Sequence, residues 1–137
     1  MKARSVILLL EDRETDVLLF RQALTSVSFH GELQVAVSPW EAREYLEGHG
    51  IFANRARFPL PNLIVCDLHM AGSTLDFLKW LRNHGDLRHV PVVLWSGHLA
   101  AAPMNTLFET GGSRCFVKKS DFERLCCDVQ AMLTHLS

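Results

Sequence analysis

Residues 61–70 read PNLIVCDLHM, an apolar run that ends on one carboxylate, that of Asp67. The four residues 63–66 carry no charge, and such a run predicts a strand that other elements cover on both faces. A charge at the end of a buried strand is costly unless a ligand or a reaction uses it. The stretch therefore predicts a central strand of a parallel sheet with a functional carboxylate at its carboxyl end.

Short apolar runs recur along the rest of the chain, and the segments between them have helical periodicity. This alternation predicts a doubly wound α/β fold. Strands are expected at residues 6–10, 33–37, 63–66, 92–95 and 115–117. Helices are expected at residues 14–25, 39–47, 75–83 and 103–110, with a fifth after residue 120. The sequences SPWE (38–41) and SDFE (120–123) are typical of capping boxes, with Ser38 and Ser120 as the predicted N-caps.

Composition narrows the class of protein. The 137 residues fit one domain, expected to span 1–137 with no output domain. The 14 basic and 15 acidic residues nearly cancel, which argues against nucleic acid or an acidic membrane as the partner. No apolar run approaches the roughly 20 residues that cross a bilayer, so a cytoplasmic location is expected. The four cysteines follow no zinc or disulfide spacing and are interpreted as reduced packing residues.

Polar side chains follow four of the predicted strands. Glu11 and Asp12 end the first, Asp67 the third and Ser96 the fourth, while the fifth runs into the lysine pair 118–119. In open parallel sheets these ends share one edge, where ligands bind. Three carboxylates there would repel by about 4 kcal/mol per contacting pair at an effective dielectric constant near 20. A hard divalent cation relieves this repulsion, and Mg2+ is the one expected.

Four motifs in this order identify a resemblance that covers nearly the whole chain. They are ED (11–12), DLHM from Asp67, WSG around Ser96 and FVKKS (116–120). Together they resemble the receiver domain of two-component response regulators. The resemblance implies a flavodoxin-like fold with a five-stranded parallel sheet of order 2-1-3-4-5 and five helices. It also implies that Asp67 accepts a phosphoryl group from a sensor histidine kinase.

The resemblance assigns roles to further residues of the site. It implies that Mg2+ is held by Glu11, Asp12, Asp67 and His69. Lys119 is expected to assist catalysis with Asp67 and Ser96, because Phe116, at the place of the family's switch residue, stands three residues before it. Alternation along the strand also turns Lys118 to the face opposite Lys119.

The signalling behaviour follows from the same resemblance. Phosphorylation is expected to draw Ser96 inward and to bring Phe116 toward the core. His69 and His98 are expected to flank the phosphoryl group and to make its lifetime depend on pH. A downstream protein or phosphotransfer partner would receive the signal. The face made by the fourth helix, fifth strand and fifth helix would serve any homodimer.

The stretches EDRETDVLLFRQAL (11–24), FANRARFPLPNLIVCDL (52–68) and CFVKKS (115–120) look like those of single-domain regulators paired with bacterial phytochrome histidine kinases. No enzymatic activity is expected beyond autophosphorylation from phosphodonors and autodephosphorylation. One alternative is a protein-binding module of receiver fold that never becomes phosphorylated. A phosphohydrolase of the haloacid-dehalogenase type would need a second aspartate two residues after Asp67, where His69 stands.

Overall fold

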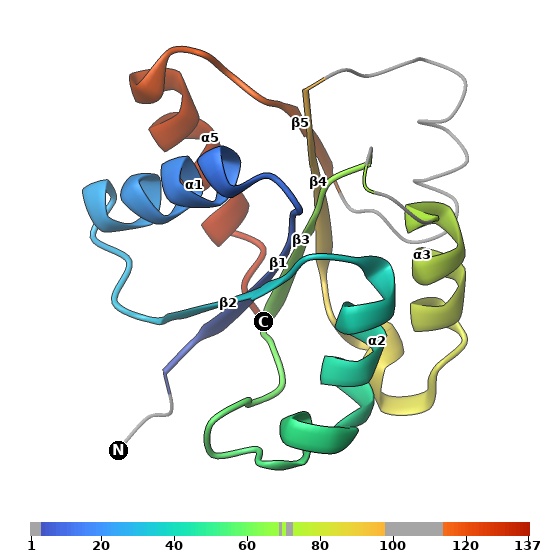
Figure 1. Ribbon diagram of the computed structural model, residues 1–137. Coiled ribbons are helices and arrows are strands. Elements are labelled where there is room, and N and C mark those ends of the chain that lie inside the picture. Colours follow the sequence, from blue (N-terminus) through green and yellow to red (C-terminus); the bar gives the residue numbers. More distant parts are fainter. Residues whose placement is uncertain (1–3, 69, 71–72, 98–113) are drawn as a thin grey trace.

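In the computed structural model, which describes residues 4–68, 70, 73–97 and 114–137, five parallel strands form one sheet (Figure 1). Their order is β2-β1-β3-β4-β5, which confirms the predicted topology. Each strand lies within one residue of its predicted position. The strands are β1 (Val6–Leu10), β2 (Glu32–Ala36), β3 (Leu63–Cys66), β4 (Val92–Ser96) and β5 (Arg114–Val117).

Helices cover both faces of this sheet. The described α-helices are α1 (Glu14–Ser26), α2 (Pro39–Glu47), α3 (Thr74–Arg82) and α5 (Phe122–Leu133), with 3-10 turns η1 (Gly50–Ala53) and η2 (Gly85–His89). Figure 1 shows α1 and α5 on one face and α2 and α3 on the other. The helix predicted at 103–110 lies outside the described residues.

Two buried clusters, one on each face, hold the layers together. Residues of β1, β3 and β4 alternate between them, as the two-residue period of a strand requires. All four side chains of β3 are buried, which confirms the prediction of a strand covered on both faces. The three central strands β1, β3 and β4 are thus buried along their whole length, and Asp67 directly follows β3.

The predicted N-cap at Ser38 is correct and the predicted N-cap at Ser120 is wrong. Ser38 Oγ accepts a hydrogen bond from Glu41 N at 3.0 Å. At the last helix the N-cap is Asp121, not Ser120, and its carboxylate accepts from Glu123 N at 2.9 Å. Aspartate and serine both cap well, so the sequence SD offers two caps in consecutive positions.

The stretch 48–61 packs down onto α2. Phe52 and Phe58 form ring contacts with Tyr45 at centroid distances of 5.3 and 5.9 Å. The Arg55 guanidinium donates to the carbonyls of Tyr45 at 2.7 Å and Leu46 at 2.8 Å. Both carbonyls lie in the last turn of α2, where the partner from a following helical turn is missing. The stretch is thus ordered by its aromatic residues and by a side chain that caps α2.

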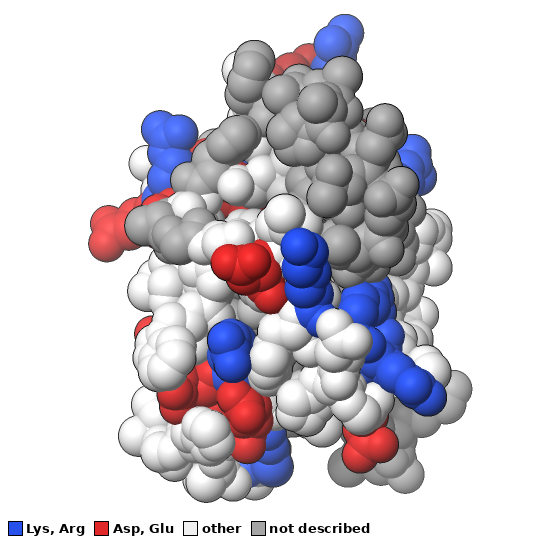
Figure 2. Space-filling view, turned by 90° about the vertical axis from the view of Figure 1, so that its right-hand side faces the viewer, with Lys and Arg blue, Asp and Glu red and all other residues white. Residues whose placement is uncertain are grey.

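Basic and acidic side chains both occur on the face shown in Figure 2, with neutral surface between them. This agrees with the formal net charge of −1. In the part of the chain that the structure describes, no helix is long and apolar enough to cross a membrane.

Candidate functional site

The strand-end carboxylates meet at one edge of the sheet. Glu11 and Asp12 follow β1, and Asp67 follows β3, the neighbour of β1. One carboxylate oxygen from each of the three lies within 4.8 Å of the others. Glu11 is fully buried, Asp67 is 3% exposed and Asp12 is exposed. The predicted gathering of these carboxylates is therefore confirmed.

The lysine at this cluster is Lys118, and the prediction that Lys119 occupies the place is wrong. Lys118 Nζ lies 2.5 Å from Glu11 Oε1 and 3.2 Å from Asp67 Oδ2. Lys119 instead pairs with Asp128 of α5 at 2.8 Å. The two ammonium groups thus belong to different parts of the molecule.

Strand alternation explains which lysine enters the site. Phe116 of β5 is buried in the cluster beneath α1 and α5, and Lys118, two residues on, points to the same side of the sheet. The backbone N of Lys118 still donates to Ser96 O at 2.7 Å, so the strand geometry continues past the end of β5. The ammonium of Lys118 lies over the Trp95 ring, 4.8 Å from its centroid. The family spacing counted from Phe116 predicts Lys119, which the structure places at Asp128 instead.

Two further residues of the site were missed from sequence. Asp16, in the first turn of α1, places Oδ2 2.8 Å from Lys118 Nζ. Thr74, the first residue of α3, donates its hydroxyl to Asp67 O at 2.9 Å and is itself buried. Thr74 therefore ties the backbone of Asp67 to α3. The only sequence signal for Asp16 is that it is an acidic residue about one helical turn after the ED pair.

Burial and mutual repulsion shape the protonation of the cluster. Burial raises the pKa of Glu11 to about 7, and the charge of Asp67 adds to this, while the hydrogen bond from Lys118 opposes it. Burial also disfavours the charged form of Lys118, but its hydrogen bonds to Asp16 and Glu11 outweigh this and raise its pKa. The ammonium is therefore charged at neutral pH, and Glu11 titrates close to neutrality.

The remaining predicted residues are placed in part. Ser96 is the last residue of β4 and is fully buried, and Phe116 is 5% exposed. Phe116 is therefore already packed into the core, with the Arg114 guanidinium 4.7 Å from its ring centroid. His69 and His98 lie outside the described residues.

The donor set suits a hard divalent cation. Carboxylate oxygens are the ligands that Mg2+ and Mn2+ prefer, and three of them converge here. Glu11 and Asp67 are buried and Asp12 is exposed, so such an ion would have protein on one side and solvent on the other. The residues present therefore fit a divalent metal, with Lys118 as the cation now in contact with two of them.

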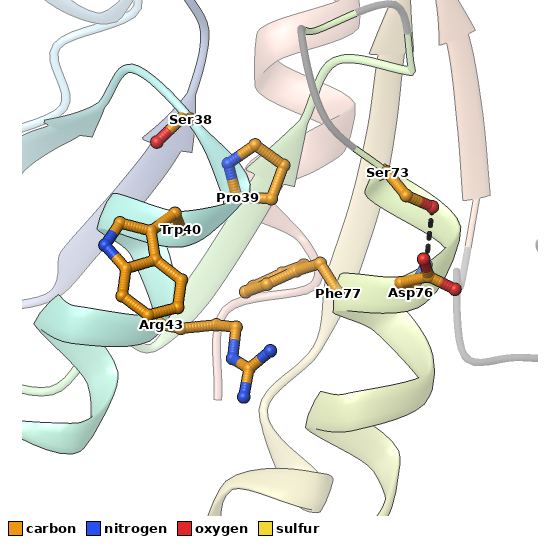
Figure 3. A pocket seen from close by; sticks show the side chains of 7 residues that line it. All are labelled: Ser38, Pro39, Trp40, Arg43, Ser73, Asp76 and Phe77. Carbon is orange, nitrogen blue, oxygen red and sulfur yellow. Dashed lines mark hydrogen bonds between the residues drawn. The ribbon is translucent and has the colours of Figure 1, made fainter.

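An open pocket between the N-terminal ends of α2 and α3 lies apart from this cluster (Figure 3). Ser38 and Ser73, the N-caps of the two helices, contribute to its lining, and Ser73 Oγ accepts from Asp76 N at 3.0 Å. Trp40 flanks the pocket with 67% of its surface exposed. The pocket shares no residue with the carboxylate cluster.

The sequence was compared with protein families and with known proteins. No protein-family model matches the sequence. Response regulator Rcp1 of Synechocystis sp. is 31% identical over 90 residues, which are 65% of this chain and 59% of that protein. The match therefore spans less than two thirds of the length of this relative.

Solved structures extend the likeness over nearly the whole chain. The Mn2+-bound form of response regulator Rcp1 matches with a TM-score of 0.83 at 25% identity, covering 95% of this chain and 92% of that one. The phosphorylated cyanobacterial phytochrome response regulator RcpA matches with a TM-score of 0.86 at 23% identity, covering 98% of both chains. The second likeness concerns the fold alone.

Proposed function

We propose that this chain, which folds as a response-regulator receiver domain and resembles the regulators of phytochrome systems, accepts a phosphoryl group on Asp67. The observation that carries the proposal is the convergence of Glu11, Asp12 and the Lys118 ammonium on a buried aspartate at the end of β3. A carboxylate so placed is a nucleophile whose surroundings can neutralise the charge of an incoming phosphoryl group.

The donor in this proposal is a phosphohistidine of a sensor histidine kinase. A carboxylate oxygen of Asp67 forms the new bond to phosphorus while the bond between phosphorus and the histidine nitrogen breaks. The electron pair of that bond stays on the imidazole. The resemblance to regulators of phytochrome systems makes a phytochrome kinase the partner to test first.

Mg2+ is the proposed cofactor, held by Glu11, Asp12 and Asp67. When bound, such an ion neutralises charge that develops on the phosphoryl oxygens. The protein's own contribution is the Lys118 ammonium, which can follow the oxygens of the phosphoryl group because it already contacts Asp67. Thr74 fixes the backbone of Asp67, so that the carboxylate keeps its orientation during transfer.

Ser96 and Phe116 are proposed as the residues that transmit the change. Ser96 ends β4 beside β3, within the sheet edge that carries Asp67. A charge of about −1.5 to −2 on Asp67 would attract the Ser96 hydroxyl and change how the end of β4 meets β5, the neighbouring strand that carries Phe116. The population would shift between two arrangements of the surface around β5. A downstream protein reading that surface completes the proposed pathway.

The proposal is tested with acetyl phosphate and Mg2+. We expect intact mass to rise by one phosphoryl group and peptide mapping to place it on Asp67. The variant Asp67→Asn keeps the shape of the side chain without its nucleophile and should gain no mass. Asp12→Ala should abolish saturable Mg2+ binding. Failure of the wild-type chain to gain mass from acetyl phosphate or from a cognate kinase would favour a phosphorylation-independent binding module.

A further inference from the structure

We infer that Asp16 is a positioning residue that retains the Lys118 ammonium at the site when a divalent cation displaces it from Glu11 and Asp67. The inference rests on the metal site of the proposed function and adds two statements to it. Lys118 and the metal compete for the same oxygens, and Asp16 holds the lysine after the exchange.

The competition follows from the position of the ammonium. Lys118 Nζ contacts Glu11 and Asp67, two of the three carboxylates that could bind a metal. Magnesium binds oxygen at about 2.0–2.1 Å, so an ion on the contacted oxygen of Glu11 would lie no more than about 5 Å from the ammonium. Two cations so close in a partly buried site repel strongly. The ammonium therefore acts as an internal counter-ion that must move when the metal enters.

Asp16 differs from the other two partners of Lys118. Its carboxylate stands on α1 and is not part of the group of three that could hold the ion. Its contact with Lys118 Nζ, at 2.8 Å, joins side chains that are only 18% and 13% exposed. The lysine can thus release Glu11 and Asp67 and keep this bond.

The surroundings restrict where the displaced ammonium can go. Lys118 lies over the Trp95 ring, and the second basic group at Asp16 is Arg13, whose Nε is 3.9 Å away and whose side chain is 76% exposed. Arg13 is therefore a weak competitor for Asp16. Between the Trp95 ring and Asp16, the ammonium stays close enough to Asp67 to meet phosphoryl oxygens later.

The test is calorimetric titration of the full chain with Mg2+ alone, which needs no phosphorylation. Lys118→Met should lower the dissociation constant about tenfold, because the competing charge is gone. In the wild-type background, Asp16→Asn should raise the Mg2+ dissociation constant several-fold. The displaced lysine then has no partner at Asp16, so it competes more strongly for Glu11 and Asp67. In the Lys118→Met background, the same Asp16→Asn change should alter the Mg2+ dissociation constant less than about twofold.

Lys119→Met is the matched control, since Asp128 holds that ammonium elsewhere. The dissociation constant of Lys119→Met for Mg2+ should remain within about twofold of the wild-type value. Lys118→Gln provides a second variant if Lys118→Met folds poorly. In a titration of the variant Trp40→Phe/Trp80→Phe, which keeps only Trp95, the fluorescence should change on Mg2+ binding as the ammonium shifts relative to the ring.

Specific outcomes overturn the inference. Unchanged affinity in both Lys118 variants would show that the ammonium does not compete. An equal effect of Asp16→Asn in both backgrounds would show that Asp16 acts directly on the metal rather than through Lys118. If Asp12→Ala abolishes Mg2+ binding while Lys118 variants have no effect, this inference alone fails. If Asp12→Ala binds Mg2+ as wild type does, the proposed metal site itself fails.

Discussion

Replacing Lys118 by methionine is expected to destabilise the metal-free protein by about 3 kcal/mol at pH 8. Lys118 is the cation in contact with Glu11 and Asp67, whose side chains are 0% and 5% exposed. Removing one partner from a buried ion pair typically costs about 3–5 kcal/mol, because the remaining charge stays buried without compensation. Methionine keeps an apolar stem of similar length for packing on Trp95, so the loss is chiefly electrostatic.

Two features place the expected loss at the lower end of that range at pH 8. The Lys118 side chain is 13% exposed, so water screens part of its interaction. Glu11, whose pKa is raised to about 7 by burial, can also take up a proton once the lysine is gone. The loss should therefore shrink as the pH is lowered toward 6, where the protonated carboxyl no longer needs a counter-ion.

The assay is urea unfolding with EDTA, followed by fluorescence. With a slope of about 2 kcal/mol per molar urea, the midpoint should fall by roughly 1.5 M at pH 8. Lys119→Met is the control, because its pair with Asp128 is 31% and 20% exposed and should contribute about 1 kcal/mol or less. The reasoning is refuted if Lys118→Met loses no more stability than Lys119→Met. It is also refuted if the loss of stability in Lys118→Met grows as the pH falls.

Further predictions concern the pH dependence of stability and the packing of residues 48–61. Between pH 4.5 and about 7 the folded protein keeps a proton on Glu11 that the unfolded chain releases, so the free energy of unfolding should fall as pH rises, by up to about 3 kcal/mol. Glu11→Gln should flatten this dependence of the free energy of unfolding on pH in urea titrations, and an unchanged dependence would contradict its assignment to Glu11. Arg55→Gln should cost about 2 kcal/mol because α2 loses its side-chain cap, whereas exposed Arg57→Gln should cost under about 0.5; equal losses would exclude the cap. Tyr45→Phe, which removes the 2.6 Å hydrogen bond to Pro59 O, should lower stability by about 1 kcal/mol in the same assay.

The layout of the domain could be predicted from local patterns. Apolar runs bounded by helical segments located all five strands within one residue. For β1, β3 and β4 the reason is that burial on both faces demands a continuous apolar sequence. The N-cap at Ser38 and the start of α2 followed from side chains that act on their own neighbours. Carboxylates directly after β1 and β3 had to meet, since parallel strands bring their carboxyl ends to one edge.

The choice between neighbouring residues was decided only by the tertiary structure. Lys118 and Lys119 are chemically identical and adjacent, and the site took the one on the face beneath α1, where Asp16 and Trp95 receive it. The capping role of Arg55 likewise depends on a loop that folds back on α2 and brings Arg55 to Tyr45, ten residues earlier in the chain. Local sequence patterns report on burial and on neighbours along the chain. Which of the two lysines reaches a distant carboxylate depends on how the helices pack against the sheet. That packing is determined by the whole fold.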